Sequence, residues 1–221
     1  IEYKIFKGNI LSEFTETTKK DGSPFKVFTP FWRNAERIYQ DKIPSLENNL
    51  KKCEKKILLF KHEIKENKIL SNNEWYKKFD KIWDPCEKSA LKQLNIFLKN
   101  SIENYSENRN FPNIIGTSKL SPYIKHGQIH VETIWKEANN YKKNSLGKKK
   151  FLAEIGWREF SHSLINFFPN MLKGNFSKKF DKFPWNRDKT NLLKWKKGIT
   201  GYPIVDAGMR ELYSTGWMHN G

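Results

Sequence analysis

The strongest constraint on the fold is the helical spacing of apolar residues after residue 85. In the segment 86–105 these residues follow an Asp84-Pro85 start, and they are Ala90, Leu91, Leu94, Phe97, Leu98, Ile102 and Tyr105. The segments 128–141, 149–168 and 203–213 repeat this spacing of three and four. Such spacing places apolar side chains on one face of an α-helix. The chain beyond residue 85 is therefore predicted to be mainly α-helical.

The first 85 residues have a different character. Residues 1–33 contain the turn signal "KKDGSPF" and then "KVFTPFWR", a short β-like stretch broken by proline, which indicates the edge of a domain. Residues 34–85 are polar and rich in lysine, so we expect a linker with one or two short helices. Because no initiator Met is present, we expect the chain to begin partway through a longer protein.

Charge and cysteine content narrow the function. The 41 basic and 24 acidic residues give a net charge of +17, which favours a polyanionic partner, either nucleic acid or an anionic membrane surface. A general bias toward Lys, Asn and Ile explains the total charge as well. Cys53 and Cys86 form no CxxC pair, so we expect no metal and a cytoplasmic location. No apolar run approaches the ~18 residues of a membrane span.

The segment "KKKFLAEIGWREFSHSLINFF" combines an apolar face with a second face whose side chains could bind a ligand. Glu154, Trp157, Arg158 and Ser161 stand at i, i+3, i+4 and i+7, away from Leu152, Ile155, Phe160 and Phe167. An indole can stack on a base, a carboxylate can accept from ring N–H groups, and a guanidinium can bind a phosphate. An ordinary Glu-Arg pair beside a packed Trp explains the same spacing, and spacing alone favours that interpretation.

Two further stretches suit anionic ligands. Gly116, Thr117 and Ser118 precede a predicted helix with Ser121 as N-cap and Pro122 at its first position, an arrangement that suits a phosphate but also describes a plain helix start. Residues 173–197 hold nine basic and two acidic residues among five aromatic ones, which suits a nucleic-acid backbone. Some of these aromatic residues would anchor the loop instead.

Four motifs together resemble one family, the DNA photolyases and cryptochromes. They are "GTSKLSPY", "EIGWREF", "TGYPIVDAGMREL" and "STGWMHN", in the order and spacing of that family. The resemblance covers residues 24–221 and includes "KVFTPFW", which is similar to the end of the family's α/β antenna domain. It implies that residues 1–33 form the C-terminal edge of that antenna-type domain and residues 34–85 the interdomain linker. Residues 86–221 would be the first part of the all-helical FAD-binding domain.

The resemblance also implies an activity. Reduced FAD, excited by light, would give an electron to a cyclobutane pyrimidine dimer flipped out of UV-damaged DNA, splitting it. The protein would be a class I deoxyribodipyrimidine photo-lyase and a monomer, with an antenna chromophore of folate or deazaflavin type left open. The His219-Asn220 pair favours cyclobutane dimers as the substrate. Since helices of this domain would lie beyond Gly221, we expect the chain alone to leave apolar faces uncovered and to bind FAD poorly.

Residue roles carried over from the family match particular positions. The expected catalytic residues are Glu154, Trp157 and Asn220. The expected FAD contacts are Tyr105, Thr117, Ser118, Lys119, Leu120, Ser121, Phe151 and Arg158. The expected DNA contacts are Arg109, Glu154, Trp157, Arg158, Ser161 and Asn220, and Trp185 resembles the surface end of the family's tryptophan electron relay. Lys119 stands where Arg is frequent, and Phe151 where some members have Trp.

Two other functions remain open at this point. A cryptochrome would keep FAD as a blue-light photoreceptor without repairing DNA, and Glu154, Trp157 and Asn220 argue against it because they serve the lesion. A non-catalytic nucleic-acid-binding helical module is supported by charge alone. It predicts a protein without a yellow chromophore.

Overall fold

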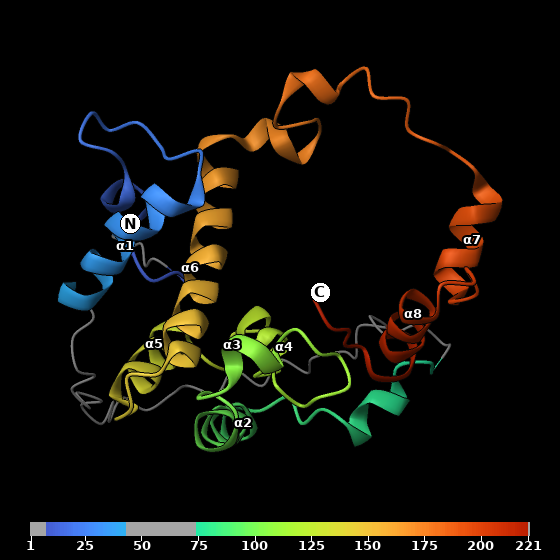
Figure 1. Cartoon of the computed structure of the whole chain (residues 1–221), viewed down its shortest axis with the longest axis horizontal. Helices are drawn as coiled ribbons and strands as arrows, with labels where there is room; N and C mark the ends of the chain where they lie inside the picture. Colours follow the sequence, from blue (N-terminus) through green and yellow to red (C-terminus); the bar gives the residue numbers. More distant parts are fainter. Residues whose placement is uncertain (1–7, 43–73, 221) are drawn as a thin grey trace, which may run out of the picture.

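The computed structural model describes residues 8–42 and 74–220 (Figure 1). Within these ranges the chain forms helices and connecting loops with no β-strand, which confirms the mainly α prediction. The α-helices are α1 Phe28–Lys42, α2 Glu87–Asn100, α3 Tyr105–Asn108, α4 Ser121–Lys125, α5 Val131–Asn140, α6 Leu146–Phe167, α7 Lys189–Lys197 and α8 Pro203–Thr215. Short 3-10 turns lie at Phe14–Thr17, Lys77–Lys81, Pro169–Leu172 and Lys178–Phe180. Cys53 and most of the predicted linker lie outside the described residues.

Helix α6 is the centre of the core. It is the longest helix, and α1, α3 and α5 all pack against it (Figure 1). The apolar residues that it buries include three of the four predicted ones, Leu152, Ile155 and Phe160. The facing residues Phe31, Tyr39, Ile134 and Trp135 are also buried. The apolar stripe of an amphipathic helix is thus covered on several sides, which fixes the direction of its polar face.

Two glycines allow neighbouring segments to approach α6 closely. A Cβ at Gly156 would lie 2.3 Å from ring carbons of Trp32, so only glycine leaves room for this indole against the helix. A Cβ at Gly147 would lie 2.1 Å from the carbonyl oxygen of Ile102, at the turn after α2. The two contacts set the positions of α1 and of the α2–α3 turn beside α6.

The prediction of a β-like stretch at residues 26–33 was wrong. This stretch reads as β-like and broken by proline, yet residues 28–33 form the first turns of α1. A proline is tolerated in the first turn of a helix because the N–H that it lacks has no partner there. Phe31, Ala35 and Tyr39 then recur every four residues and are buried. Helix α1 therefore crosses the predicted boundary between residues 33 and 34.

The ends of α2 and α8 match the sequence signals to within a few residues. Helix α2 follows Cys86, whose Sγ accepts a hydrogen bond from the Ser89 N–H at 3.4 Å, so the start lies just after the predicted Asp84-Pro85. Leu91 was predicted on the buried face but is exposed. Pro203 opens α8, at the start of the predicted segment 203–213, and Gly216 closes it in a left-handed conformation with φ 73°.

Helices α7 and α8 form a pair at the opposite end of the molecule from α1 (Figure 1). Asp206 holds the turn between them, because its carboxylate accepts from the N–H and hydroxyl of Thr200, each at 2.7 Å, and from the N–H of Gly201 at 3.0 Å. The Trp83 indole donates to the Thr215 carbonyl oxygen at 2.6 Å. Most apolar side chains of α8 are exposed, with Ile204 at 70%.

Candidate functional site

An open cavity of about 1040 Å³ lies between the loop 109–126, helix α6 and the end of α8. Three segments far apart in the sequence supply its walls. They bring together nine of the predicted site residues: Tyr105, Arg109, Thr117, Ser118, Lys119, Leu120, Ser121, Glu154 and Asn220. Lys125, His126, Trp217, Met218 and His219 complete much of the lining, and His219 belongs to the His-Asn pair that favours cyclobutane dimers as the substrate.

An ion pair joins two of the segments that form the cavity wall. The Arg109 guanidinium, just after α3, donates to the Glu154 carboxylate on α6. The Lys150 ammonium lies 3.4 Å from the same carboxylate oxygen. The guanidinium also lies over the Tyr105 ring, 5.5 Å from its centroid. Burial raises the pKa of the Tyr105 phenol to about 12, so this hydroxyl is protonated at neutral pH.

The loop 117–121 presents polar groups to the cavity. Its conformation depends on Lys119, which has a positive φ of 52°, and on Gln93, whose amide donates to the Ser118 carbonyl oxygen at 2.9 Å. The Lys119 ammonium lies 4.8 Å from the ring centroid of Trp217. Ser121 is the first residue of α4, so its predicted N-cap role was wrong. Leu120 takes that position, and no side chain caps the helix.

The segment after α8, residues 217–220, reaches the cavity without regular secondary structure. The backbone is held instead by the Thr215 hydroxyl, which accepts from the Trp217 N–H at 3.1 Å. His219 Nε2 lies 2.7 Å from the Arg109 carbonyl oxygen. Since that oxygen can only accept, the ring nitrogen is the donor, and the histidine ties the two walls together.

Trp157 does not line the cavity, although it belongs to the same predicted stripe as Glu154. Its indole stacks on Phe28 of α1, with ring centroids 3.7 Å apart and planes 9° from parallel. The residue is still 43% exposed. One face of the indole is thus taken by α1, which agrees in part with the packed-Trp interpretation of the spacing.

Arg158 points toward a residue that the sequence analysis missed. Its guanidinium donates to Glu159 at 2.6 Å, and the second carboxylate oxygen of Glu159 accepts from the Leu11 N–H at 2.8 Å. Glu159 is only 3% exposed, and this burial raises the pKa of its carboxyl, although the two donors oppose the rise. A carboxylate four residues from Ile155, on the apolar face, was the signal that could have revealed it.

The other predicted residues are spread over the molecule. Phe151 is buried between Phe97 and Tyr105, with centroid distances of 4.6 and 5.4 Å, so it backs the cavity wall without lining it. The Ser161 hydroxyl donates to the Trp157 carbonyl oxygen within α6. Trp185 is 64% exposed and contacts Phe183, far along the segment 173–197.

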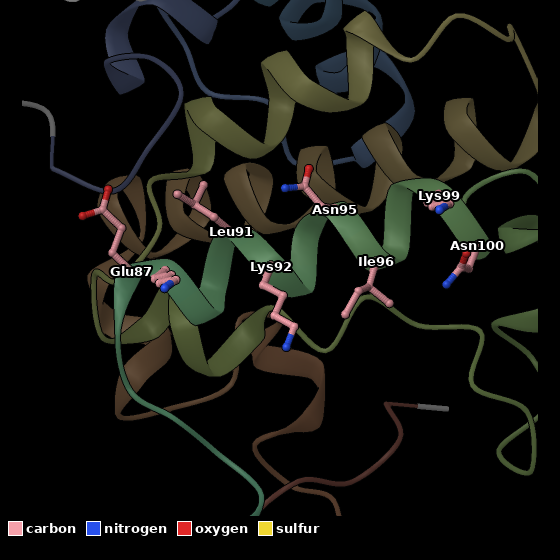
Figure 2. A pocket seen from close by; sticks show the side chains of 8 residues that line it. Glu87, Leu91, Lys92, Asn95, Ile96, Lys99 and Asn100 are labelled. Atoms are coloured by element: carbon pink, nitrogen blue, oxygen red, sulfur yellow. The ribbon is translucent and has the colours of Figure 1, made fainter.

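A second hollow lies on the outer face of α2 (Figure 2). Leu91 and Ile96 are its apolar residues, and Lys92 and Lys99 stand beside them. None of the predicted site residues belongs to it. Within residues 8–42 and 74–220, no three acidic, histidine or cysteine side chains are grouped to hold a metal ion, and no helix is long and apolar enough to cross a bilayer.

Comparison with known proteins agrees with the motifs. Residues 151–221 match the family model described as the FAD binding domain of DNA photolyase. A deoxyribodipyrimidine photo-lyase of Agrobacterium fabrum is 35% identical over 218 residues, covering 97% of this chain and 45% of the relative. Cryptochrome-2 of Arabidopsis thaliana is 30% identical over 244 residues, covering all of this chain and 38% of the relative.

A solved structure shares the fold as well. The crystal structure of a bacterial class III photolyase from Agrobacterium tumefaciens has a TM-score of 0.76 and 30% identity, over 96% of this chain and 45% of that one. The chain thus spans about half the length of the relatives that it matches, and class I membership stays a prediction. From its motifs, fold and relatives, the chain belongs to the DNA photolyase and cryptochrome family, whose helical domain binds FAD.

Proposed function

We propose that the protein is a photolyase that splits cyclobutane pyrimidine dimers in UV-damaged DNA with FAD and light. The observation that carries this proposal is the convergence of nine predicted site residues on one cavity. These residues come from three segments that are separated by tens of positions in the sequence. A nucleic-acid-binding module would need a basic surface but no such enclosed group of hydroxyls, cations and a carboxylate.

The groups around the cavity fit FAD. The hydroxyls and backbone of the loop 117–121, with Lys119 and Lys125 nearby, form a polar and cationic wall suited to a pyrophosphate. Tyr105 and Trp217 offer aromatic surface to a ring system. The chemistry that bound, reduced FAD supplies is a light-driven electron for the lesion. The chain's own residues bind and orient the two reactants.

Three residues would hold the damaged DNA. The Glu154 carboxylate can accept hydrogen bonds from the N–H groups of a flipped pyrimidine, and the Asn220 amide can both donate and accept. The Arg109 guanidinium suits a backbone phosphate, which it can contact through two N–H groups. Trp157, with one face on Phe28, can in addition offer its exposed part to a base.

The test is repair of a defined lesion by the full protein. The substrate is an oligonucleotide with one cyclobutane thymine dimer, and the readout is the fraction of dimer remaining after blue-light exposure. We expect loss of the dimer in light, with dark and FAD-depleted samples unchanged. Binding of FAD and of the oligonucleotide without any loss of dimer in light would overturn the proposal.

A cryptochrome-type photoreceptor is the second candidate. The observation in its favour is the 30% identity to Cryptochrome-2 over the whole of this chain. A photoreceptor would bind FAD and respond to light without splitting the dimer. The repair assay therefore separates the two functions, and an absorption spectrum of the purified protein separates both from a module without a flavin.

A further inference from the structure

The ion pair between Arg109 and Glu154 joins two residues that are both expected to bind DNA. The guanidinium contacts the carboxylate directly, and each side chain is about one quarter exposed. The backbone of Arg109 is fixed by the His219 imidazole, which donates to its carbonyl oxygen at 2.7 Å. The guanidinium is therefore held against the carboxylate, and a ligand that takes the place of this contact on either group must displace the other group.

The environment of Glu154 allows Arg109 to leave. The Lys150 ammonium lies 3.4 Å from the same carboxylate oxygen, one helical turn away on α6. If Arg109 turned away, Lys150 would still lie beside the carboxylate as a cation, but the carboxylate would lose the hydrogen bond that the guanidinium donates. The Arg109 guanidinium, in contrast, needs a new anionic partner once it leaves Glu154.

We propose that Arg109 exchanges partners when DNA binds, moving from Glu154 to a backbone phosphate, and that this exchange makes binding depend on the lesion. The inference rests on the proposed function and concerns the regulation of the same site. A guanidinium binds a phosphate through two parallel hydrogen bonds, and these replace the interaction that Arg109 loses with the Glu154 carboxylate. The released carboxylate oxygen then gains only if a base offers it an N–H group.

Selectivity follows from this exchange. An undamaged strand brings a phosphate but keeps its bases stacked, so the loss of the ion pair is only half compensated. A dimer, which is easier to flip, brings both the phosphate and the N–H donors. The ion pair therefore lowers the affinity for undamaged DNA, and Arg109 and Glu154 together set the specificity for the lesion.

The experiment measures the affinity of the full protein for two single-stranded oligonucleotides of one sequence, with and without a central cyclobutane thymine dimer. The variants are Glu154→Gln, Arg109→Gln and the double variant. Glu107→Gln is the matched control, because Glu107 is an exposed carboxylate on α3 outside the cavity and its loss changes the net charge equally. Thermal unfolding of each variant checks the fold.

Glu154→Gln is expected to bind the undamaged oligonucleotide about 2- to 5-fold more tightly than wild type, the scale of a partly exposed ion pair. The control should show a smaller gain that is equal for both oligonucleotides. The gain should vanish in the double variant, since Arg109 is the group released. A gain no larger than that of Glu107→Gln, or one that persists without Arg109, would overturn the exchange.

The outcomes also separate this inference from the proposed function. One outcome is that Glu154→Gln loses preference for the dimer while its affinity for the undamaged strand stays at wild-type level. In that case Glu154 recognises the lesion, but the ion pair does not lower the affinity for undamaged DNA, and only the exchange is overturned. If wild type itself shows no preference for the dimer, the proposed function fails. The affinity for the undamaged strand still decides whether Arg109 is released to phosphate.

Discussion

Phe28 on α1 and Trp157 on α6 stack face to face, with ring centroids 3.7 Å apart and planes 9° from parallel. This contact joins the helix that follows the N-terminal segment to the helix that carries Glu154. It also occupies one face of the indole, which is still 43% exposed. The contact therefore links stability of the core to the position of a residue expected to touch the lesion.

Replacing Phe28 with Ala should lower the free energy of unfolding by about 2 kcal/mol, because it removes the stack and part of the core contact with Phe160. Chemical denaturation measures this change. Val27→Ala is the control, since Val27 is 61% exposed and should change stability little. Equal stability of the Phe28 variant and wild type would show that the stack contributes nothing.

Gly156→Ala should destabilise the protein by about 1–3 kcal/mol, since the added methyl group would lie 2.3 Å from the Trp32 ring. Gly174→Ala is a matched control, because the nearest atom there is 4.0 Å away. The midpoints of denaturant unfolding give the comparison. Two equal midpoints would mean that α1 moves away from α6 without cost.

Asp206 should make the α7–α8 turn sensitive to acid. Burial acts to raise the pKa of its carboxyl, but the hydrogen bonds from Thr200 and Gly201 outweigh it and hold the pKa below the usual 3.8. Because the folded pKa is depressed, its contribution to stability is present above pH about 4 and is lost as the pH falls through the folded pKa.

The variant Asp206→Asn should therefore be less stable than wild type at neutral pH, and the difference should shrink in acid. Urea unfolding at pH 7 and at pH 3 measures both. A difference that stays constant between the two pH values would contradict a role for the ionised carboxylate.

The basic segment 173–197 should contribute to the electrostatic part of DNA binding. Replacing Lys178, Lys179 and Lys182 with Gln should reduce the slope of log affinity against log salt by about 2, if each lysine meets one phosphate of a single strand. The matched control replaces Lys88, Lys92 and Lys99, which all line the hollow on α2. A slope that changes equally in both triple variants would mean that only total charge matters.

Sequence reasoning found the elements whose signals are local. Pro203 and Gly216 bound α8 because proline and glycine act on their own backbone. The β-like stretch at residues 28–33 became a helix because burial of Phe31, Ala35 and Tyr39 against α6 is a tertiary effect. Glu159 was missed because a buried carboxylate is explained only by its partners, Arg158 and Leu11, and one of these lies 148 positions away.

The site was predicted in part, and for a similar reason. The motifs located the residues of the loop 117–121, and the structure placed them beside Glu154 and Asn220. The stripe through Glu154, Trp157 and Arg158 was treated as one face. In the structure three different neighbours divide it: Arg109 pairs with Glu154, Phe28 with Trp157, and Glu159 with Arg158. Helical spacing gives a direction around the axis, but not the element that each side chain meets.

A repair site built around Glu154 is tested by the rate at which blue light splits a dimer bound to the full protein with FAD, measured for wild type, Glu154→Gln and Glu107→Gln at saturating protein. We expect splitting in wild type and in Glu107→Gln at similar rates, and slower splitting in Glu154→Gln. A Glu154→Gln rate equal to wild type, or no splitting in any FAD-loaded sample, would contradict a repair site built around this carboxylate.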